Sequence, residues 1–510
     1  MNIKLLHTRL FFQAVVVLAF FTGSIFAQST ETQKISNLAG IVDSSNFGYA
    51  VALSESLLVV GAPENDKDAG HFYVFFKNKS NEWQQVGNVI APPWGDLGLD
   101  AFGYNVDIDG DQVIVGSYGA NLGFQGNAAI WTVDTAQDSV IFDGILEQPS
   151  GDAFIFGFYG FDVSISGNYA VVGAPNSGAN GGTAYIFSRS DTSVGWNFDK
   201  KISASDAYSG ENFGRSVAIS GNNIIVGTAG ILSPVDSSGA VYFFQKNNDE
   251  WTELIKFTAD TPTGGDQFGW SVDIDSDYAV VGAPGDGNTG AAYIFHWNGS
   301  SWEKETRITP PDGAAGDLFG ESVSISGTTI CASAFGNNDS TGVCYVYSKS
   351  SNGWEQSAKI ISSDIKAGDG FGKSVSISND WIACGAPFSD DGAIDAGAVY
   401  LFEKSSVLSV EDKSPESIPR EFNLSQNYPN PFNPSTTIEF SIPKQSFVTL
   451  KVYDLLGREI ATLVNKELMS GSYKTEFNAS SAKSKLASGI YLYRLNAGGN
   501  VQTKKFILMK

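Results

Sequence analysis

The stretch FGWSVDIDSDYAVVGAP, residues 268–284, contains the pattern that decides the fold. It opens on the aromatic-glycine pair Phe268-Gly269 and reaches a Gly-Ala-Pro motif 14 positions later, at Gly282. Between them, valine and isoleucine alternate with short polar residues, which is typical of a β-strand. A more apolar run from Tyr278 to Gly282 follows. The stretch therefore predicts two antiparallel strands joined by a tight turn.

This pattern occurs seven times along the chain. The aromatic-glycine pairs begin at Phe47, Phe102, Tyr159, Phe213, Phe268, Phe319 and Phe371. Successive pairs are 51 to 57 residues apart, and a valine stands four positions after every aromatic residue. The small residues that alternate with the apolar ones indicate that another sheet packs closely there. A third strand follows each hairpin, and a fourth begins near a tryptophan in most copies. Units of about 50 residues with four antiparallel strands are typical of β-propeller blades.

The sequence thus predicts an all-β fold, with a seven-bladed β-propeller over residues 28–404 and a small Ig-like β-sandwich after it. The last copy runs into a polar segment and has no tryptophan strand of its own. The segment Gln33–Leu38 lies before the first aromatic-glycine pair, where other copies have their outer strand. We expect this segment to complete the last blade, because ring closure removes an exposed sheet edge.

The Phe-Gly pair followed by Gly-Ala-Pro resembles the FG-GAP repeat of integrin α-subunit propellers, and most of all its short bacterial version. The resemblance covers residues 30 to 404, although the second, fourth and sixth copies depart from the motif. It implies that the loops after the second strands, with those before the Phe-Gly pairs, form a ligand-binding face. Aromatic residues in or beside these loops are candidate ligand contacts, with packing against their own blade as the alternative. These candidates are Trp94, Tyr118, Phe124, Phe335 and Phe388.

The carboxy-terminal part has a different composition. Residues 405–419 are polar and predict a linker, and residues 420–510 hold 12 Lys+Arg against 6 Asp+Glu in a chain whose net charge is −23. Such a charge reversal indicates a separate domain. Five strands are predicted in it, over residues 436–440, 448–452, 473–477, 490–495 and 506–508.

Four motifs of this domain carry a second resemblance. They are Asn427-Tyr-Pro-Asn-Pro-Phe-Asn-Pro434, Lys451-Val-Tyr-Asp-Leu-Leu-Gly-Arg458, Ser488-Gly-Ile-Tyr-Leu-Tyr493 and Lys504-Lys-Phe506. Together they resemble the type A sorting domain of the bacterial type IX secretion system. The resemblance implies that residues 420–510 are an export address for the type IX secretion machinery, with an ordinary accessory Ig-like domain as the alternative.

The amino terminus predicts export as well. Residues 1–27 begin with basic residues and continue as an apolar run, which is typical of a signal peptide cleaved after Ala27. A membrane-spanning helix is the alternative, but the run is short. We therefore expect a protein that is secreted or held at the outer-membrane surface of a Gram-negative bacterium.

Composition and spacing exclude several functions. The net charge of −23 opposes nucleic-acid binding, and three histidines leave little material for a metal or catalytic cluster. The acids at Asp107, Asp109 and Asp111 lack calcium-loop spacing, because their turn is too short. We interpret them, and the equivalent acids from Asp273, as solvated turn residues. No catalytic residue, metal or other cofactor is predicted.

The three cysteines lie in the sixth and seventh copies. Cys331 and Cys344 flank one loop on neighbouring strands, so an exported protein can join them in a disulfide. Cys384 belongs to the next blade and is expected to stay a buried free thiol.

The leading functional hypothesis is a monomeric binding or adhesion protein for an extracellular protein or glycan, without catalytic activity. The rival hypothesis is an extracellular hydrolase acting on polysaccharide or peptide, in which acids from different blades converge at the ring axis.

Overall fold

β-Strands account for nearly all regular structure in the computed structural model of the chain, as the sequence predicts. The structure describes residues 28–29, 31–36, 38, 43–64, 70–88, 90–93, 101–119, 125–152, 156–177, 181–190, 195–207, 210–229, 238–408, 422–444, 446–468, 471–479 and 486–509. The chain divides into two units, Met1–Val410 and Glu411–Lys510. Within these described ranges no helix is long and apolar enough to cross a membrane. The predicted signal peptide, residues 1–27, lies outside them.

The first unit consists of seven consecutive sheets, numbered here along the chain. Sheet 1 contains β3 (Ala50–Leu53), β4 (Leu57–Ala62), β5 (His71–Lys77) and β6 (Trp83–Gln85). Sheet 2 contains β7 (Asn105–Asp109), β8 (Gln112–Ser117), β9 (Asn127–Asp134) and β10 (Ser139–Ile145). Sheet 3 contains β11 (Val163–Ser166), β12 (Tyr169–Ala174), β13 (Thr183–Ser188) and β14 (Asn197–Ile202). Sheet 4 contains β15 (Ser216–Ser220), β16 (Asn223–Gly227), β17 (Val241–Asn247) and β18 (Glu250–Phe257).

Sheets 5 to 7 follow the same order. Sheet 5 contains β19 (Val272–Asp275), β20 (Tyr278–Ala283), β21 (Ala291–Trp297) and β22 (Trp302–Ile308), with a short 3-10 helix, η2, at Asp286–Asn288. Sheet 6 contains β23 (Phe319–Ser326), β24 (Thr329–Ala334), β25 (Val343–Ser350) and β26 (Gly353–Ile360). Sheet 7 contains β27 (Val375–Ile377), β28 (Trp381–Ala386), β29 (Ala398–Glu403) and β2 (Gln33–Ser36). The described part of this unit also contains two short α-helices, α1 (Asn337–Ser340) and α2 (Lys404–Leu408).

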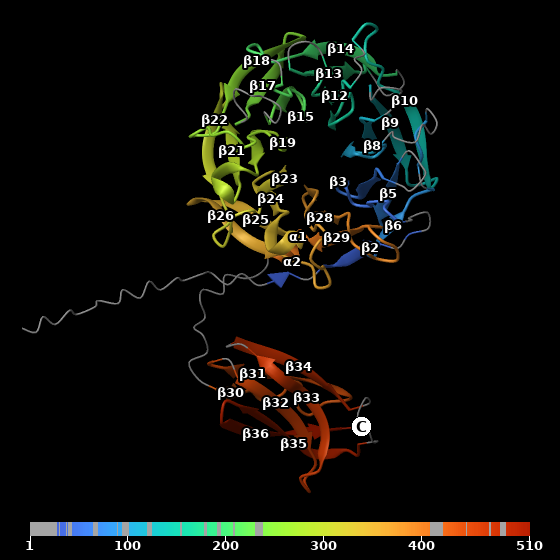
Figure 1. Cartoon of the computed structure of the whole chain (residues 1–510). Helices are drawn as coiled ribbons and strands as arrows, with labels where there is room; N and C mark the ends of the chain where they lie inside the picture. Colours follow the sequence, from blue (N-terminus) through green and yellow to red (C-terminus); the bar gives the residue numbers. More distant parts are fainter. Residues whose placement is uncertain are drawn as a thin grey trace, which may run out of the picture. The chain divides into compact units, whose positions relative to one another are not determined.

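The seven sheets surround a common axis (Figure 1). Each innermost strand contacts the innermost strand of the next sheet, and β27 contacts β3. A separate cluster of buried apolar side chains fills the space between each sheet and the next. This arrangement is consistent with a β-propeller, as the sequence predicts.

The amino-terminal strand β2 completes sheet 7. It pairs antiparallel with β29, with Gln33 opposite Leu401 and Ser36 opposite Ala398. The prediction that residues near Gln33 supply the missing outer strand is confirmed. The sequence did not indicate β1 (Gln28–Ser29), which adds to sheet 6 in parallel with β26.

Close contact between sheets explains the glycines of the repeat. A Cβ atom added to Gly282 in sheet 5 would lie 2.0 Å from the carbonyl oxygen of Gly320 in the next repeat. Gly320 itself has a φ of +92°, a conformation that favours glycine. The same approach recurs at other sheet junctions, for example between Gly61 and Gly103. The aromatic-glycine pair and the glycine of Gly-Ala-Pro therefore belong to one contact between neighbouring sheets.

The second unit contains two antiparallel sheets around one shared core. One sheet contains β30 (Asn423–Leu424), β31 (Ser435–Ile442) and β34 (Gly471–Asn478). The other contains β33 (Glu459–Leu468), β32 (Ser446–Tyr453), β35 (Gly489–Ala497) and β36 (Asn500–Leu508). All five predicted strands are present, whereas β30 and β33 were not predicted.

Candidate functional site: the mouth of the central channel

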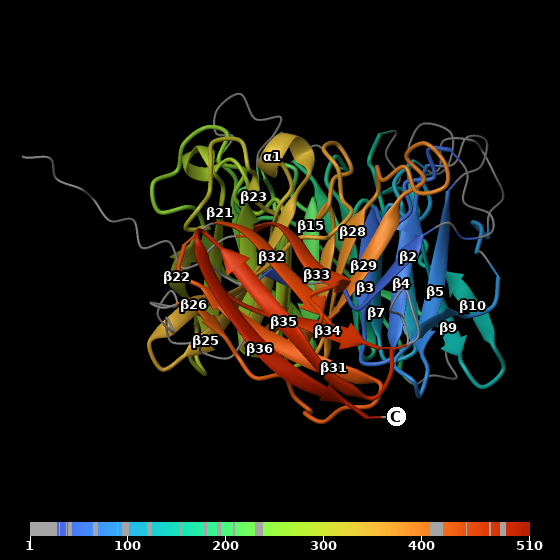
Figure 2. The ribbon, with the colours of Figure 1, turned by 90° about the horizontal axis from the view of Figure 1, so that it is seen from below.

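Seven side chains, one from each sheet of the ring, surround one end of the axial channel. Each stands two positions after the aromatic residue of its repeat, just before or at the beginning of an innermost strand. We call this set the mouth ring: Tyr49, Tyr104, Phe161, Arg215, Trp270, Glu321 and Lys373. They line a cavity of about 240 Å³. Figure 2 shows the ring from the side, with α1 among the loops at one of its ends.

Aromatic contacts connect one half of the mouth ring. The ring centroids of Tyr49 and Tyr104 are 5.0 Å apart, and those of Tyr104 and Phe161 are 5.1 Å apart. Burial raises the pKa of the Tyr49 and Tyr104 hydroxyls, so both stay neutral donors at physiological pH. This half of the mouth therefore offers apolar ring surface with polar hydroxyl groups at its edge.

The other half of the mouth ring carries charge. Lys373 forms an ion pair with Glu321, at 2.8 Å between Nζ and Oε1. The Arg215 guanidinium lies 3.7 Å from the ring centroid of Trp270 and 5.0 Å from that of Phe161. Among the described residues, Arg215 has no acidic group within ion-pair distance, and its Nε has no hydrogen-bond partner. Among the described residues, Arg215 is thus a cation of the mouth without a direct ion pair, and Glu321 and Asp162 act on it only at longer range.

Two of the candidate aromatic residues lie beside the mouth ring. Tyr118 packs against Tyr104, with ring centroids 4.5 Å apart, and against Phe161. Phe335 lies 5.3 Å from the Lys373 ammonium. Both side chains are half-buried, so each can pack against its own sheet and also contact a ligand.

Of the other three candidates, the structure describes only Phe388. Phe388 is half-buried, and its ring borders Gly370 together with that of Phe335. Trp94 and Phe124 lie outside the described residues. The sequence did not predict the mouth ring, because its residue types differ from copy to copy. Its signal was the constant offset from each aromatic-glycine pair.

Below the mouth, acids connect neighbouring sheets. Asp107 Oδ2 accepts hydrogen bonds from Ser164 Oγ and the Ile165 N–H of the next sheet, both at 2.8 Å. Asp273 accepts equivalent bonds from Ser324 Oγ, at 2.9 Å, and the Ile325 N–H, at 2.8 Å. The interpretation as solvated turn residues is therefore wrong for Asp107 and Asp273, whose side chains bind the neighbouring sheet, whereas Asp111 and Asp277 are exposed in the turns as expected.

Burial in the channel wall changes the ionisation of these acids. It raises the pKa of Asp107 to about 7 and that of Asp273 to about 6, despite the hydrogen bonds that favour the charged form. Asp162 has the same environment, with a bond from the Val217 N–H at 2.6 Å and a pKa raised by burial to about 7. At other junctions a serine connects the sheets in place of the aspartate. At one of them, Ser376 Oγ accepts a hydrogen bond from the Leu53 N–H.

The opposite end of the channel opens into a cavity of about 930 Å³. The hairpin turns that line it contribute the acids Glu55, Asp109, Asp111 and Asp275. Asp109 and Asp275 each accept a backbone N–H from the turn of the next sheet, from Gly167 and Gly327. Asp109 and Asp275 therefore also connect neighbouring sheets. We take the mouth ring, and not this acidic cavity, as the candidate binding site.

The ring of sheets and its inter-sheet glycines define a class, the FG-GAP type of repeat protein. The chain belongs to the FG-GAP repeat family, as the sequence motifs indicated. Six segments match this family and together cover more than half of the chain: residues 30–75, 150–187, 196–244, 251–295, 302–347 and 354–402. Most of the second copy, which departs from the motif at Gly116-Ser-Tyr118, falls outside the matches.

Residues 426–509 match the secretion system C-terminal sorting domain. This match confirms the second resemblance, and it implies export, with secretion or attachment at the cell surface. No curated protein matches the chain.

Solved structures resemble the chain only distantly. A chain of the mitotic checkpoint complex is 12% identical, with a TM-score of 0.44, over 79% of this chain and 99% of that one. A hypothetical selenium-binding protein from Sulfolobus tokodaii is 12% identical, with a TM-score of 0.42, over 59% of this chain and 74% of that one. A putative 6-phosphogluconolactonase from Bacteroides uniformis is 15% identical, with a TM-score of 0.42, over 62% of this chain and 85% of that one.

Proposed function

We propose that the protein is a monomeric, non-catalytic binding or adhesion protein, a seven-bladed β-propeller whose mouth ring holds an extracellular protein or glycan. Residues 28–404 form the propeller, and residues 420–510 form an Ig-like sandwich that addresses the chain to the type IX secretion machinery of a Gram-negative bacterium. The exported protein is released from the cell or held at the outer-membrane surface.

The observation that carries the proposal is the unpaired Arg215 guanidinium between two aromatic faces. A guanidinium offers several N–H donors in a fixed plane, which suits a carboxylate or another planar anion. Trp270 and Phe161 offer flat apolar surface beside it, as binding sites for sugars and side chains commonly do. A cavity of about 240 Å³ has room for one such group. The ligand is therefore expected to insert a single acidic group, either an acidic side chain of a protein or an acidic sugar of a glycan.

A panel of acidic and neutral glycans and peptides tests the proposal. Each would be titrated against the purified full-length mature protein, the Arg215→Gln variant and the Arg189→Gln variant. Arg189 is the matched control, since it also lies over a tryptophan, 4.8 Å from the Trp196 ring, but does not line the mouth. Loss of one charge-assisted hydrogen bond should weaken binding of an acidic ligand about tenfold or more in Arg215→Gln. Equal affinities for the two variants would contradict the proposal.

The hydrolase hypothesis has one observation in its favour. Asp107 and Asp162 have pKa values near 7, which suits a general acid. Their carboxylates are, however, engaged by N–H groups of the next sheet. Product formation on the same panel that disappears in Asp107→Asn would support the hydrolase, and saturable binding without product supports the binding protein.

A further inference from the structure

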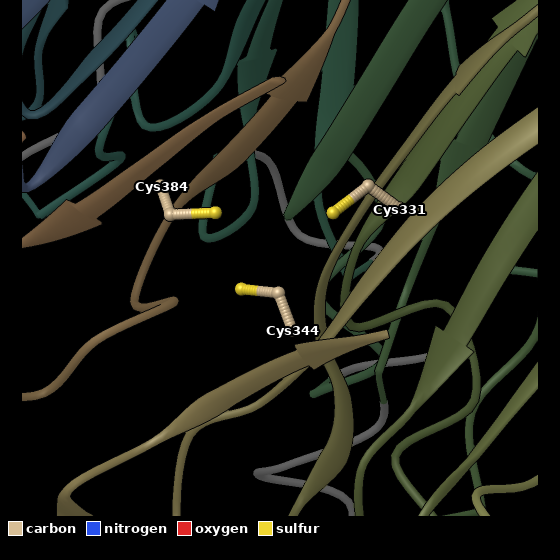
Figure 3. Close-up of side chains that lie close together, drawn as sticks. All are labelled: Cys331, Cys344 and Cys384. Carbon is tan, nitrogen blue, oxygen red and sulfur yellow. The ribbon is translucent and has the colours of Figure 1, made fainter. Parts of the chain in front are cut away.

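The three cysteines of the chain meet at one point between sheets 6 and 7. Cys331 lies on β24 and Cys344 on β25, whereas Cys384 comes from β28 of the next sheet. All three are fully buried, and their sulfur atoms lie within 4.8 Å of one another. Figure 3 shows the three sulfur atoms in the space between strands of the two sheets.

Strand register places Cys331 and Cys344 close together on sheet 6. Cys331 is opposite Val346 and Cys344 is opposite Ser333, so the two cysteines are diagonal neighbours on one face of sheet 6. All three thiols are free in the structure, and the Cys331–Cys344 disulfide is not formed. Cys384 is free and buried as expected, but it was not expected to join the other two.

The junction between sheets 6 and 7 differs from its neighbours at one position. Ser333 stands where the other repeats have the glycine that contacts the next sheet. The facing Gly372 lies against the Ser333 Cβ and the Cys344 sulfur. Apolar side chains, including Val346, Phe371 and Val375, surround the thiols. Within the described residues this is the one convergent group of three or more Cys, His, Asp or Glu side chains, and no fourth such ligand joins it.

We propose that Cys331, Cys344 and Cys384 bind one Cu(I) ion in a three-sulfur, trigonal site. Cysteine sulfur is a soft ligand that selects Cu(I), Zn(II) and iron–sulfur clusters. Structural zinc sites take four ligands, and iron–sulfur clusters usually take four cysteines, whereas this junction supplies three. Metal–sulfur bonds of about 2.3 Å place three sulfurs about 4 Å apart, so a small inward movement of the side chains completes the site.

Binding releases a proton from each thiol that becomes a thiolate, and the copper stays in the Cu(I) state throughout. Full burial means that the ion enters as sheets 6 and 7 come together during folding. The bound ion would therefore link sheet 7 to sheet 6.

The test uses the full-length mature protein, refolded without oxygen in the presence of Cu(I) and then challenged with a Cu(I) chelator. The proposal predicts one retained copper per chain, near-ultraviolet absorption from copper–sulfur charge transfer, and a higher melting temperature than that of the apo-protein. Cys384→Ser should retain copper about tenfold less well or worse, with no copper-dependent rise in melting temperature. Equal retention by both proteins, or a preference for Zn(II) over Cu(I), would overturn the proposal.

A second measurement does not depend on the folding of a variant. Thiols are counted in the denatured, unreduced protein purified from its exporting host. Three free thiols after removal of the metal support the copper site. A single free thiol shows a disulfide within the cluster and overturns it.

Discussion

In six of the seven repeats, the glycine 14 positions after the aromatic residue contacts the next repeat. Gly282→Ala would place a methyl group 2.0 Å from the Gly320 carbonyl oxygen, so the sheets must separate. We expect a loss of about 1–3 kcal/mol of unfolding free energy, which is typical of overpacking. Gly195→Ala is the matched control, because nothing lies within 4 Å of its added Cβ. Thermal and chemical denaturation of the two variants measure the difference, and equal stabilities would contradict the packing explanation.

The buried acids predict how stability depends on pH. Burial raises the pKa of Asp107 to about 7, above the 3.8 expected of an exposed aspartate, so the folded state holds the proton more tightly than the unfolded state. This contribution to stability is present at low pH and is lost as the pH rises through about 7.

Asp107→Asn removes this titration and keeps an oxygen that can accept the Ile165 N–H. Relative to the native protein, the melting temperature of the variant should therefore rise as the pH increases from 3.8, the value of an exposed aspartate, to the raised pKa of about 7, and stay constant above it. Asp273→Asn, at the equivalent position of sheet 5, should behave in the same way up to a pKa of about 6. Melting curves at several pH values check both variants. A difference that stays constant with pH would show that these acids are not protonated in the folded state.

At the scale of strands, the amino-terminal segment completes sheet 7 by pairing with β29. A mature chain that begins at Leu38 would leave the β29 edge without its partner and remove Ile35 from the junction between sheets 7 and 1. We expect oligomerisation or a melting temperature several degrees lower, because an exposed edge pairs with other chains.

The matched control begins at Thr32, so it loses β1 and keeps β2. Size-exclusion chromatography with light scattering and thermal denaturation compare the two truncated proteins. If the chain from Leu38 stays monomeric with an unchanged melting temperature, β2 does not close the ring.

The repeat pattern predicted the elements well, because each strand has a fixed offset from an aromatic-glycine pair. It even predicted the strand at Gln33, through the absence of a tryptophan strand after Phe402. Contacts between sheets were harder to predict from the sequence. The sequence around Asp107 has the pattern of a solvated turn. The Ile165 N–H of sheet 3, which donates to the Asp107 carboxylate, is brought beside it only by the fold. Likewise, nothing in the spacing of Cys331, Cys344 and Cys384 indicates that two sheets bring their sulfurs together.

At the scale of the whole molecule, the two units have separate tasks. The sorting domain match at residues 426–509 assigns export to the second unit. Deletion of residues 420–510 should therefore leave the ring of sheets folded but retained in the periplasm of the native host. Cell fractionation and surface proteolysis measure this, with a reporter fused to residues 420–510 as the control that should reach the surface. Surface display of the truncated chain would contradict the assignment.

The central claim is that the ring presents a ligand site at its mouth, built around Arg215. The structure of a complex with a ligand from the binding panel tests it most directly. The predicted result is an anionic group of the ligand within hydrogen-bond distance of the Arg215 guanidinium, with the rest of the ligand against Trp270 or Phe161. A ligand bound at the outer edge of a sheet, or in the acidic cavity at the opposite end of the channel, would contradict the claim.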